Sequence, residues 1–464
     1  MTTYDYDLIV IGTGPSGQKA AVQGAKAGKR VAIVDKREFV GGVCVNTGTI
    51  PSKTLREAVL YLSGFRERNI YGSAYRVKHH ITMEDLSFRC DHVMRHETDI
   101  IQHQMFRNGI DLINGIATFE DAHTLNVHML TSDKRITGAH IVIAVGTTPA
   151  TGKGIPFSPD KIMTSDSIMR MQTVPRSLCV IGAGVIGIEY ASIYAALGTR
   201  VTVIDMRPQL LDFVDDELIA ALTYHLRQQR VTIRLGEKVD NVTIDEETGK
   251  VVTHLNSGKR IITDKALYSI GRQGNTARLN LQAVGLEPDK RGRLKVNENY
   301  QTAVPHIYAV GDVIGFPSLA STSMEQGRLA SAHAFGLSTD SYSDLFPYGI
   351  YTIPEISVVG KAERELTDAN IPYEVGKAHY REISRGQIIG DNIGMLKIIF
   401  SIEDRRVLGV HIIGEGAAEL IHIGQAVMAF NGTIDYFVNT VFNYPTLAEA
   451  YKVAALDGIN RLSL

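Results

Sequence analysis

Two glycine-rich turns with the same internal spacing constrain the fold of this chain more than any other feature of its sequence. They occupy residues 12–17 and 182–187. Each follows a short apolar run and leads into a stretch of small residues with helical character, and a second apolar run then ends in an acid, Asp35 or Asp205. The two turns and the two acids are each 170 positions apart. One such match is weak evidence, but two matched copies between apolar runs indicate two dinucleotide-binding βαβ units.

Each glycine of such a turn has its own role. Gly12 permits the tight turn, Gly14 lets the backbone approach a pyrophosphate, and Gly17 lets the helix pack close to the strand. The helix N-terminus then offers free N–H groups to a diphosphate, and Asp35 is expected to accept hydrogen bonds from a ribose. The alternative is a glycine turn that binds no ligand. The second unit repeats these expectations with Gly182, Gly184, Gly187 and Asp205.

Later apolar runs predict how the two units are completed. The runs 141–147 and 266–272 are expected to be the closing strands, and the run 307–312 to return the chain to the first unit. From about residue 348 the strand-like runs lack glycine-rich turns, and two helical stretches follow, near 417–430 and 446–462. The predicted fold class is α/β, with two Rossmann-like dinucleotide-binding domains and a C-terminal mixed α/β domain. The predicted borders place the first domain at 1–147 and 272–345, the second at 148–271 and the third at 346–464.

Composition excludes several classes of protein. The chain has 464 residues, 44% of them hydrophobic, and a formal charge of −2, so bulk electrostatics favour neither nucleic acid nor an anionic membrane as partner. No apolar run reaches the roughly 20 residues that span a bilayer, and the first residues do not resemble a signal peptide. The three cysteines are widely spaced and form no disulfide framework. We therefore expect a cytoplasmic protein without a metal site.

The segment Val40–Lys53 resembles the redox-active helix of the flavoprotein disulfide reductases. The resemblance implies that the first unit binds FAD. It also implies that Asp312, after Gly311, holds the ribityl chain, and that Lys53 pairs with Glu189 beside the flavin N5, where a lysine stabilises negative charge on the flavin. A solvated helix face is the alternative for this pair. The resemblance further assigns cofactor-binding positions to Lys36, Gly42, Gly146, Gly271 and Arg272.

The same segment departs from the family at the redox pair. The family has two cysteines five positions apart, whereas this chain has Cys44 and then Thr49. The family also has a His-Pro near the C-terminus, oriented by a glutamate, whereas this chain has Tyr444 in place of the histidine and retains Glu449. Tyrosine, with a pKa near 10, is a poor base at neutral pH. We infer that dithiol chemistry has been lost while flavin chemistry is kept. Cys44 is then either a small buried residue or a thiolate in charge transfer with the flavin.

The acid of the second unit bears on the choice of coenzyme. Asp205 favours a free ribose 2′-hydroxyl, and hence NAD. Arg207 is a cation that could reach the 2′-phosphate of NADP; the alternative is a surface charge without contact. Because the chain has both residues, it is expected to accept NAD(H) and NADP(H).

Over its whole length the chain is most similar to the soluble pyridine nucleotide transhydrogenases of this fold. Four runs carry the similarity: 48–53, 182–193, 349–357 and 442–446. The resemblance implies a ping-pong relay in which NADPH reduces FAD, NADP leaves, and NAD+ takes the hydride at the same site. It also implies that the C-terminal domain is an interface domain that forms a homodimer or a larger homo-oligomer.

Three other functions remain open at this stage. One is an NAD(P)H diaphorase that passes electrons to quinones, dyes or oxygen through the same residues. Another is a dihydrolipoyl dehydrogenase, which would need the missing cysteine and histidine. The third is a non-catalytic flavoprotein, against which the two intact turns, both acids and the Lys53–Glu189 pair argue.

Overall fold

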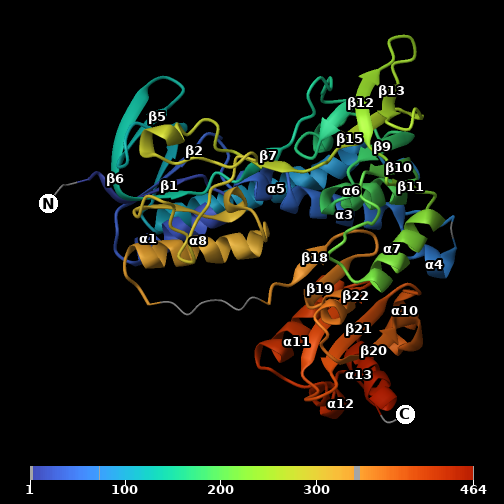
Figure 1. Ribbon diagram of the computed structural model, residues 1–464. Coiled ribbons are helices and arrows are strands. Elements are labelled where there is room, and N and C mark those ends of the chain that lie inside the picture. The colour runs from blue at the N-terminus through green and yellow to red at the C-terminus, as the bar shows by residue number, and fades with distance from the viewer. Residues whose placement is uncertain (1–3, 73, 339–344, 463–464) are drawn as a thin grey trace.

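The computed structural model describes residues 4–72, 74–338 and 345–462, which form three lobes. Figure 1 shows the first lobe on the left, the second on the upper right, and the third below the second. The first lobe contains a mixed sheet whose β3, β2, β1, β6 and β17 are parallel, the second contains a parallel sheet, and the third contains an antiparallel sheet. The predicted α/β class, with two dinucleotide-binding folds and a mixed C-terminal domain, is therefore confirmed.

The first lobe is built on a seven-stranded sheet whose central strand is almost entirely apolar. β1 (Tyr6–Ile11) lies between two parallel neighbours, and its residues 8–11 are buried on both faces. Burial on both faces is typical of parallel strands covered by helices. In order of pairing the strands are β3 (Asp111–Asn114), β2 (Val31–Asp35), β1, β6 (Asp133–Ile143), β5 (Thr124–His128) and β4 (Ile116–Phe119), and β17 (Ile307–Ala309) pairs with β6.

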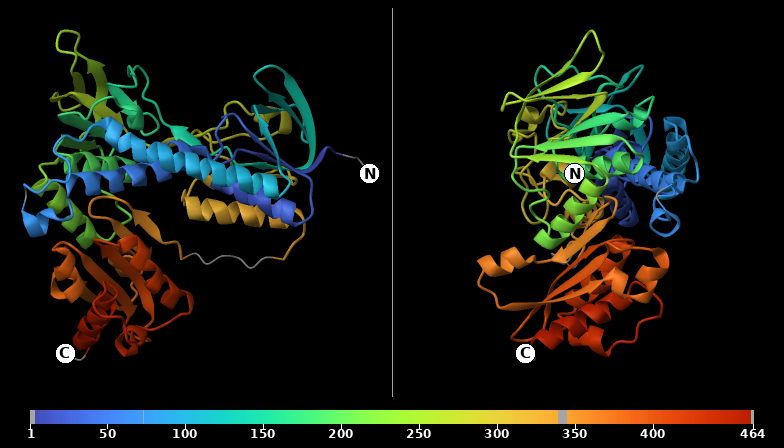
Figure 2. Two further views of the ribbon diagram at one scale, coloured as in Figure 1. Left: turned by 180° about the vertical axis from the view of Figure 1, so that it is seen from behind. Right: turned by 90° about the vertical axis from the view of Figure 1, so that its right-hand side faces the viewer.

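Two helices far apart in sequence pack together beneath this sheet. α1 (Pro15–Lys26) and α8 (Ala320–Ala334) lie side by side in Figures 1 and 2. They approach so closely that a Cβ atom at Gly327 would lie 2.0 Å from the carbonyl oxygen of Ser16. Together with β17, α8 confirms that the chain returns to the first lobe after the second one. The turns η2 (Leu281–Val284) and η3 (Gly311–Ile314) belong to the returning segment.

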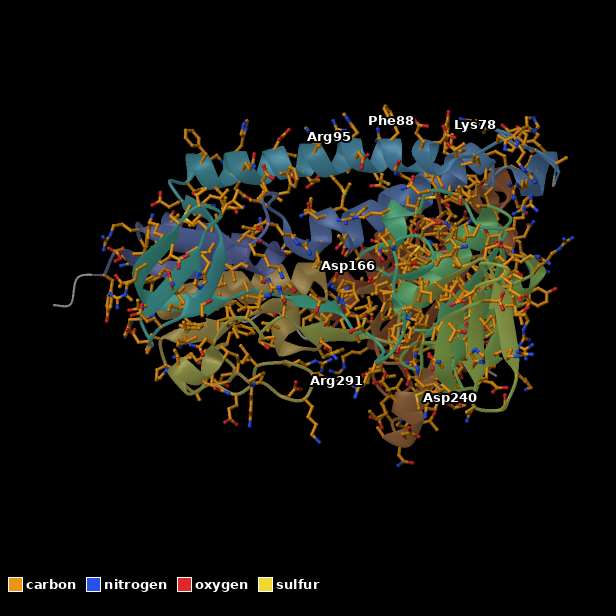
Figure 3. The ribbon with its side chains drawn as sticks, turned by 90° about the horizontal axis from the view of Figure 1, so that it is seen from above. Lys78, Phe88, Arg95, Asp166, Asp240 and Arg291 are labelled. Carbon is orange, nitrogen blue, oxygen red and sulfur yellow. The ribbon has the colours of Figure 1, made fainter. Side chains whose placement is uncertain are left out.

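A long pair of helices joins the first lobe to the second. α3 (Thr49–Ser63) packs against α5 (Met83–Arg107), which starts with a capping box between Thr82 and Asp85. Figure 3 shows α5 along the edge of the molecule, with Phe88 and Arg95 directed outward. The short helices α2 (Gly42–Asn46) and α4 (Arg68–Tyr71) flank α3.

The second lobe repeats the first on a smaller scale. β9 (Ser177–Ile181) is its central strand, and α6 (Val185–Ala196) follows the second glycine turn. The sheet order is β11 (Thr232–Leu235), β10 (Arg200–Asp205), β9, β15 (Lys265–Tyr268) and β8 (Ile162–Thr164). Around it lie α7 (Asp216–Gln228), η1 (Ile168–Arg170) and a three-stranded antiparallel sheet of β12 (Val239–Ile244), β13 (Val251–Leu255) and β14 (Arg260–Thr263).

The crossings between the first two lobes differ from the prediction. The expected strands 141–147 and 266–272 end earlier, at Ile143 and Tyr268, because glycines at positive φ, Gly146 at 62° and Gly271 at 138°, turn the chain out of each sheet. The residues that follow form β7 (Thr147–Pro149) and β16 (Arg272–Gly274), which pair antiparallel with each other. The predicted borders at 147 and 271 fall at this crossing and stay predictions.

The third lobe is an antiparallel sheet covered by helices. Its order is β18 (Tyr348–Ile350), β19 (Ile356–Gly360), β22 (Val407–Ile413), β21 (Met395–Ser401) and β20 (Tyr373–His379). The two expected helices are α11 (Ala417–Ala429) and α13 (Glu449–Leu462), and α13 packs on β20. The short helical segments are α9 (Glu363–Asp368), η4 (Tyr380–Glu382), α10 (Ser384–Ile389) and α12 (Asp435–Asn439). In none of the three lobes, over the described ranges, is a helix both long and apolar enough to cross a bilayer.

Candidate functional site

The first glycine turn forms a cradle that side chains could not share. Gly12 has φ +112°, and a Cβ there would lie 2.4 Å from the carbonyl oxygen of Ala144. A Cβ at Gly17 would lie 1.9 Å from the carbonyl oxygen of Gly12, so the helix packs directly on the turn. At Gly14 a Cβ would meet no atom within 4 Å. The open side of the turn therefore faces a cavity, as expected of a glycine that admits a ligand.

The helix that follows the turn leaves its first amides free. Gly14 is the N-cap of α1, and no side chain caps this helix. Pro15 lies in the first turn, where its lack of an N–H group costs no hydrogen bond. Uncapped helix N-termini bind anions through backbone N–H groups and the helix dipole. The geometry thus suits a diphosphate.

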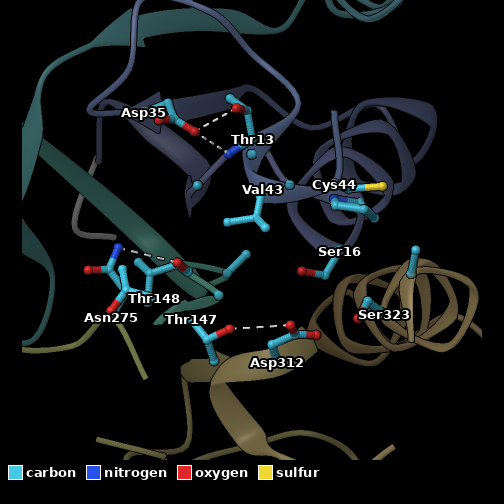
Figure 4. A pocket seen from close by; sticks show the side chains of 18 of the residues that line it. Thr13, Ser16, Asp35, Val43, Cys44, Thr147, Thr148, Asn275, Asp312 and Ser323 are labelled. Carbon is cyan, nitrogen blue, oxygen red and sulfur yellow. Dashed lines mark hydrogen bonds between the residues drawn. The ribbon is translucent and has the colours of Figure 1, made fainter. Parts of the chain in front are cut away.

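Asp35 ends β2 above this turn. It accepts hydrogen bonds from the Thr13 amide at 2.8 Å and the Thr13 hydroxyl at 2.5 Å (Figure 4). The Arg37 amide donates a third hydrogen bond to it at 2.9 Å. Asp35 and its neighbour Lys36 both line the cavity. Burial, followed by the positive charge of Arg37, lowers the pKa of the Lys36 ammonium.

The cavity beside the turn has a volume of about 140 Å³. Asp312 stands on the wall opposite Asp35 and makes one weak hydrogen bond, at 3.4 Å, with the hydroxyl of Thr147 (Figure 4). Burial raises the pKa of this carboxyl, with Arg272 acting in the opposite direction. An acid with spare acceptor capacity suits a polyol. Predicted residues that line the cavity are Gly12, Gly14, Asp35, Lys36, Gly42, Cys44, Thr49, Gly146 and Asp312.

Three further glycines of the first lobe, Gly42, Gly146 and Gly311, stand where the backbone has a positive φ, and two of them also stand where a side chain would collide with a neighbour. Gly42 has φ +61°, and a Cβ there would lie 2.8 Å from the Cα of Gly14. Gly311 has φ +78°, and its Cβ would lie 2.7 Å from the hydroxyl of Ser16. Gly146, also at positive φ, opens on free space at the cavity wall. The structure brings all of these around one turn.

The second glycine turn reproduces the first. Gly182 has φ +102°, and a Cβ there would lie 2.6 Å from the carbonyl oxygen of Ser269. A Cβ at Gly187 would lie 1.9 Å from the carbonyl oxygen of Gly182, as at Gly17. Gly184 is the N-cap of α6, again without a side-chain cap. The helix amides here are free for a second diphosphate.

Asp205 and Arg207 lie together beside this second turn. Asp205 accepts a hydrogen bond from the Ala183 amide at 2.7 Å. Its two carboxylate oxygens also accept hydrogen bonds from Nε and Nη2 of Arg207, at 3.1 and 2.9 Å. Asp205 is buried, whereas 41% of the Arg207 side chain is exposed. The guanidinium is 4.0 Å from where a Cβ of Gly184 would lie, so it stands at the mouth of the cradle.

Lys53 and Glu189 form the ion pair that the resemblance implies. Nζ of Lys53 lies 2.8 and 3.0 Å from the two carboxylate oxygens of Glu189. Glu189 is buried, and it also accepts the amide of Tyr351 at 2.8 Å. A solvated helix face is therefore ruled out for Glu189. Both residues line a larger cavity, of about 670 Å³, which runs from Thr49 and Asp312 to Gly184 and Arg272. Thr49, Thr147 and Asp312 also line the first cavity, so the two cavities adjoin, and the larger one reaches Gly184 of the second glycine turn.

Cys44 is a free thiol at the wall of the first cavity (Figure 4). Burial raises the pKa of the Cys44 thiol, while a hydrogen bond with Thr49 acts in the opposite direction. The other two cysteines, Cys90 and Cys179, are buried elsewhere and free. Within the described ranges, then, Cys44 has no thiol partner, and its raised pKa favours the neutral thiol.

The structure does not bring Tyr444 and Glu449 to the cavities of the same chain. Tyr444 is 71% exposed and shares a hydrogen bond with the Ser384 hydroxyl. Glu449 is the first residue of α13, and one of its carboxylate oxygens is buried without a hydrogen-bond partner in the described chain. Both therefore stand apart from Lys53, on the surface and at the edge of the third lobe.

Arg272 and Gly271 occupy the crossing between the first two lobes. Arg272 donates to the Thr147 hydroxyl at 2.8 Å and to the Thr147 carbonyl at 2.9 Å, and it pairs with Asp166 at 3.2 Å. Arg272 and Gly271 both line the larger cavity. Their polar contacts are within the protein, so in this structure they tie the lobes together at the cavity wall.

Sequence reasoning missed several residues of the site. Thr13 fixes Asp35 through its amide and hydroxyl, and its place inside the glycine turn could have shown this. Tyr351 lies with its ring centroid 4.9 Å from Nζ of Lys53. Tyr351 lies in the run 349–357 that carries the family similarity, but no local pattern indicated its contact with Lys53, because about 300 residues separate the two.

Comparison with known proteins agrees with this geometry. Residues 6–327 match the family described as pyridine nucleotide-disulphide oxidoreductase, and residues 346–455 match the dimerisation domain of that family. The chain belongs to the pyridine nucleotide-disulphide oxidoreductase family. This membership confirms the predicted resemblance and identifies an oxidoreductase fold that works with flavin and NAD(P).

Individual relatives of the family narrow the comparison. A protein of Mycobacterium bovis named soluble pyridine nucleotide transhydrogenase is 55% identical over 460 residues, covering 99% of this chain and 98% of the relative. One of Colwellia psychrerythraea with the same name is 46% identical over 465 residues, covering 99% of each. Among solved structures, the HOCl-induced flavoprotein disulfide reductase RclA from Escherichia coli superposes with a TM-score of 0.87 at 26% identity, covering 97% of this chain and 99% of RclA.

Proposed function

We propose that this protein is an FAD-dependent soluble pyridine nucleotide transhydrogenase that moves hydride from NADPH to NAD+ without a redox-active disulfide. The observation that carries the proposal is a cavity that reaches from Thr49 and Asp312, on the wall of the first cavity, to Gly184 of the second glycine turn. Its wall carries the Lys53–Glu189 pair, and Thr49 stands where a second cysteine would be. The names of the relatives at 46–55% identity support the same activity.

The residues of the first cradle fit FAD. Gly12, Gly14 and Gly17 leave room for a diphosphate where side chains would collide, and the start of α1 presents free amides to it. Asp35 is placed for a ribose, and Asp312 has spare acceptor capacity for a polyol chain. When bound, FAD would supply a two-electron carrier that accepts hydride from one nicotinamide and gives it to another.

The second cradle would bind both nicotinamide coenzymes in turn. Gly182, Gly184 and Gly187 repeat the diphosphate site, and Asp205 would accept the ribose hydroxyls of NAD(H). Arg207, exposed at the same mouth, would receive the 2′-phosphate of NADP(H). Because Arg207 neutralises Asp205 in the same site, the acid would repel that phosphate less than an unpaired acid would.

The other residues would orient the two rings and keep water out. Hydride transfer needs no acid or base, but it needs close, fixed contact between the reacting rings. Lys53 holds a positive charge at the cavity wall, and Glu189 fixes it there. Thr49 forms a hydrogen bond with Cys44 but cannot form a disulfide with it. The chain therefore has no disulfide at this position that could accept electrons from the flavin.

The working enzyme would be a cytoplasmic homodimer or larger homo-oligomer assembled through the third lobe. The match to a dimerisation domain over residues 346–455 supports this assembly. Tyr444 and Glu449 lie in that lobe, away from the cavities of their own chain, so they would act across the interface rather than within one chain.

Turnover with two nicotinamides tests the proposal. We would mix the purified yellow protein with NADPH and thio-NAD under anaerobic conditions and follow thio-NADH, with lipoamide as a parallel acceptor. Fast formation of thio-NADH and none of reduced lipoamide is the expected result. Flavin reduction by NADPH without transfer to thio-NAD would overturn it and favour a diaphorase that uses quinones or dyes.

A further inference from the structure

The Lys53–Glu189 pair is the meeting point of all three lobes. Lys53 lies on α3 of the first lobe and Glu189 on α6 of the second. The third lobe contributes Tyr351, whose amide donates to Glu189 at 2.8 Å and whose ring faces the Lys53 ammonium at 4.9 Å. One residue of the third lobe therefore contacts both members of the pair.

The segment 351–355 is fastened on both sides. Towards the second lobe, the Ile353 amide donates to the Ser192 hydroxyl at 3.1 Å. Towards the first lobe, the buried Arg56 donates through Nε to the Thr352 carbonyl at 2.9 Å and pairs with Glu355 at 3.3 Å. Arg56 stands one helical turn after Lys53 on α3, so the anchor and the ammonium belong to the same rigid element.

The ring of Tyr351 holds the ammonium in a way that a carboxylate or hydroxyl would not. An aromatic face attracts a cation within about 6 Å of its centroid without accepting a strong hydrogen bond. The Lys53 ammonium has three N–H donors. It donates hydrogen bonds to the two carboxylate oxygens of Glu189, at 2.8 and 3.0 Å. The ring thus fixes Lys53 and leaves its remaining donor for an acceptor in the cavity that both Lys53 and Tyr351 line.

We propose that Tyr351 is a positioning residue that sets the place of the Lys53 ammonium, and through it the midpoint potential of the flavin. The proposal rests on the proposed function only in taking the cavity to hold flavin. It couples the third lobe to the redox centre through segment 351–355, because a shift of that segment moves the ring that Lys53 faces.

The test is a double-mutant cycle read as flavin midpoint potential in the full-length holoenzyme. Tyr351→Leu removes the ring but keeps the backbone amide for Glu189. We expect it to weaken the stabilisation of negative charge 2- to 5-fold, the usual range for exposed cation–π contacts. That change converts to a potential lower by roughly 10–20 mV at about 30 mV per tenfold for two electrons. Tyr351→Phe keeps the ring, and its potential is expected to equal that of the wild type.

The Lys53→Met background makes the cycle decisive. Without an ammonium, Tyr351→Leu is expected to leave the potential unchanged, because the ring then has nothing to position. An equal shift in both backgrounds, or no shift in either, would overturn the proposal. Thermal unfolding of each variant identifies any that fail to fold, in which case Tyr351→Val takes the place of Tyr351→Leu.

A second readout separates this inference from the proposed function. If the purified protein holds no flavin, the function fails, but acylation of Lys53 in the full-length chain still tests the ring. Mass spectrometry of labelled peptides, with the exposed Lys134 as internal reference, is expected to show labelling of Lys53 about 2- to 5-fold faster in Tyr351→Leu than in Tyr351→Phe. Equal labelling in the two variants would contradict the proposal.

Discussion

At the scale of the residue, the electrostatics of the site depend on a few buried contacts. Burial raises the pKa of the Cys44 thiol, and Nζ of Lys53 lies 2.8 Å from a carboxylate oxygen of Glu189. Beside the second glycine turn, Arg207 donates two hydrogen bonds to Asp205. Three predictions belong to this scale.

Substitution of Asp205 is expected to change the KM for NAD+ more than the KM for NADPH. Asp205→Ala is expected to raise the KM for NAD+ about 10-fold, the size of one lost charged hydrogen bond, and to affect NADPH much less. The reason is that only the free ribose of NAD needs the carboxylate. Steady-state kinetics with each coenzyme measure the effect, and equal losses for both would remove the assigned ribose role.

Substitution of Arg207 is expected to change the KM for NADPH more than the KM for NADH. Arg207→Ala is expected to raise the KM for NADPH about 10-fold with little change for NADH, since a charged phosphate contact contributes roughly 1.5–3 kcal/mol. Arg200→Ala is the matched control, because Arg200 is exposed at the opposite end of β10, the strand after which Arg207 follows. If Arg207→Ala behaves like Arg200→Ala, then Arg207 is a surface charge without contact.

Restoring the histidine does not restore dithiol chemistry. Tyr444→His is expected to give no reduction of lipoamide, because Thr49 cannot form a disulfide with Cys44. An anaerobic assay with NADH and lipoamide measures this. Any lipoamide turnover above the wild-type background would invalidate the argument that the dithiol route is lost.

At the scale of the element, sequence reasoning succeeded where the pattern was local. The runs 8–11 and 178–181, the turns after them and the acids Asp35 and Asp205 lie as predicted, because buried parallel strands and glycine turns have strong local signals. The long helix α5 and the β12–β14 sheet were not predicted. The outer face of α5 carries Phe88 and Phe106 exposed, which weakens its amphipathic period, and the small sheet has short, half-polar strands.

Two glycines of one turn distinguish packing from ligand approach. Gly187→Ala places a Cβ 1.9 Å from a backbone oxygen, whereas at Gly184 the nearest atom is 4.0 Å away, at the tip of Arg207. Gly187→Ala is expected to lower the melting temperature and abolish NADPH-driven flavin reduction. Gly184→Ala is expected to keep the melting temperature and lose most of the reduction rate. Equal melting temperatures and rates in the two variants would contradict the assigned roles.

At the scale of the whole molecule, the three lobes are joined by buried charges that no sequence pattern revealed. Lys397 on β21 is fully buried and pairs with Asp215 at 2.9 Å and Glu217 at 2.7 Å, which lie at the start of α7 in the second lobe. Glu363 pairs with it from the third lobe. Contacts between residues about 180 positions apart lie beyond any local period, so this part of the architecture required the structure.

The interlobe cluster predicts a pH-dependent stability. Lys397→Met is expected to destabilise the fold by about 3 kcal/mol, because it leaves the buried carboxylate of Asp215 without its ammonium partner. Lys377→Met, at the partly exposed edge, is expected to cost under about 1 kcal/mol. Burial would raise the pKa of Glu217, but Lys377 and Lys397 hold it below its ordinary value. Its contribution is therefore complete above pH 4.5, its ordinary value, and is lost as pH falls through the lower folded pKa. Urea unfolding at pH 7 and pH 4 measures both effects, and equal stability of the two variants would refute the cluster's role.

The central claim is that electrons pass through flavin alone, and an anaerobic titration tests it most directly. NADPH is added to the yellow protein in known amounts, and the flavin absorbance is followed until it stops changing. We predict that about one equivalent per flavin completes the change, since Thr49 leaves no disulfide to fill, and that NAD+ then restores the yellow colour. A requirement for two equivalents, or a failure of NAD+ to restore the colour, would contradict the account.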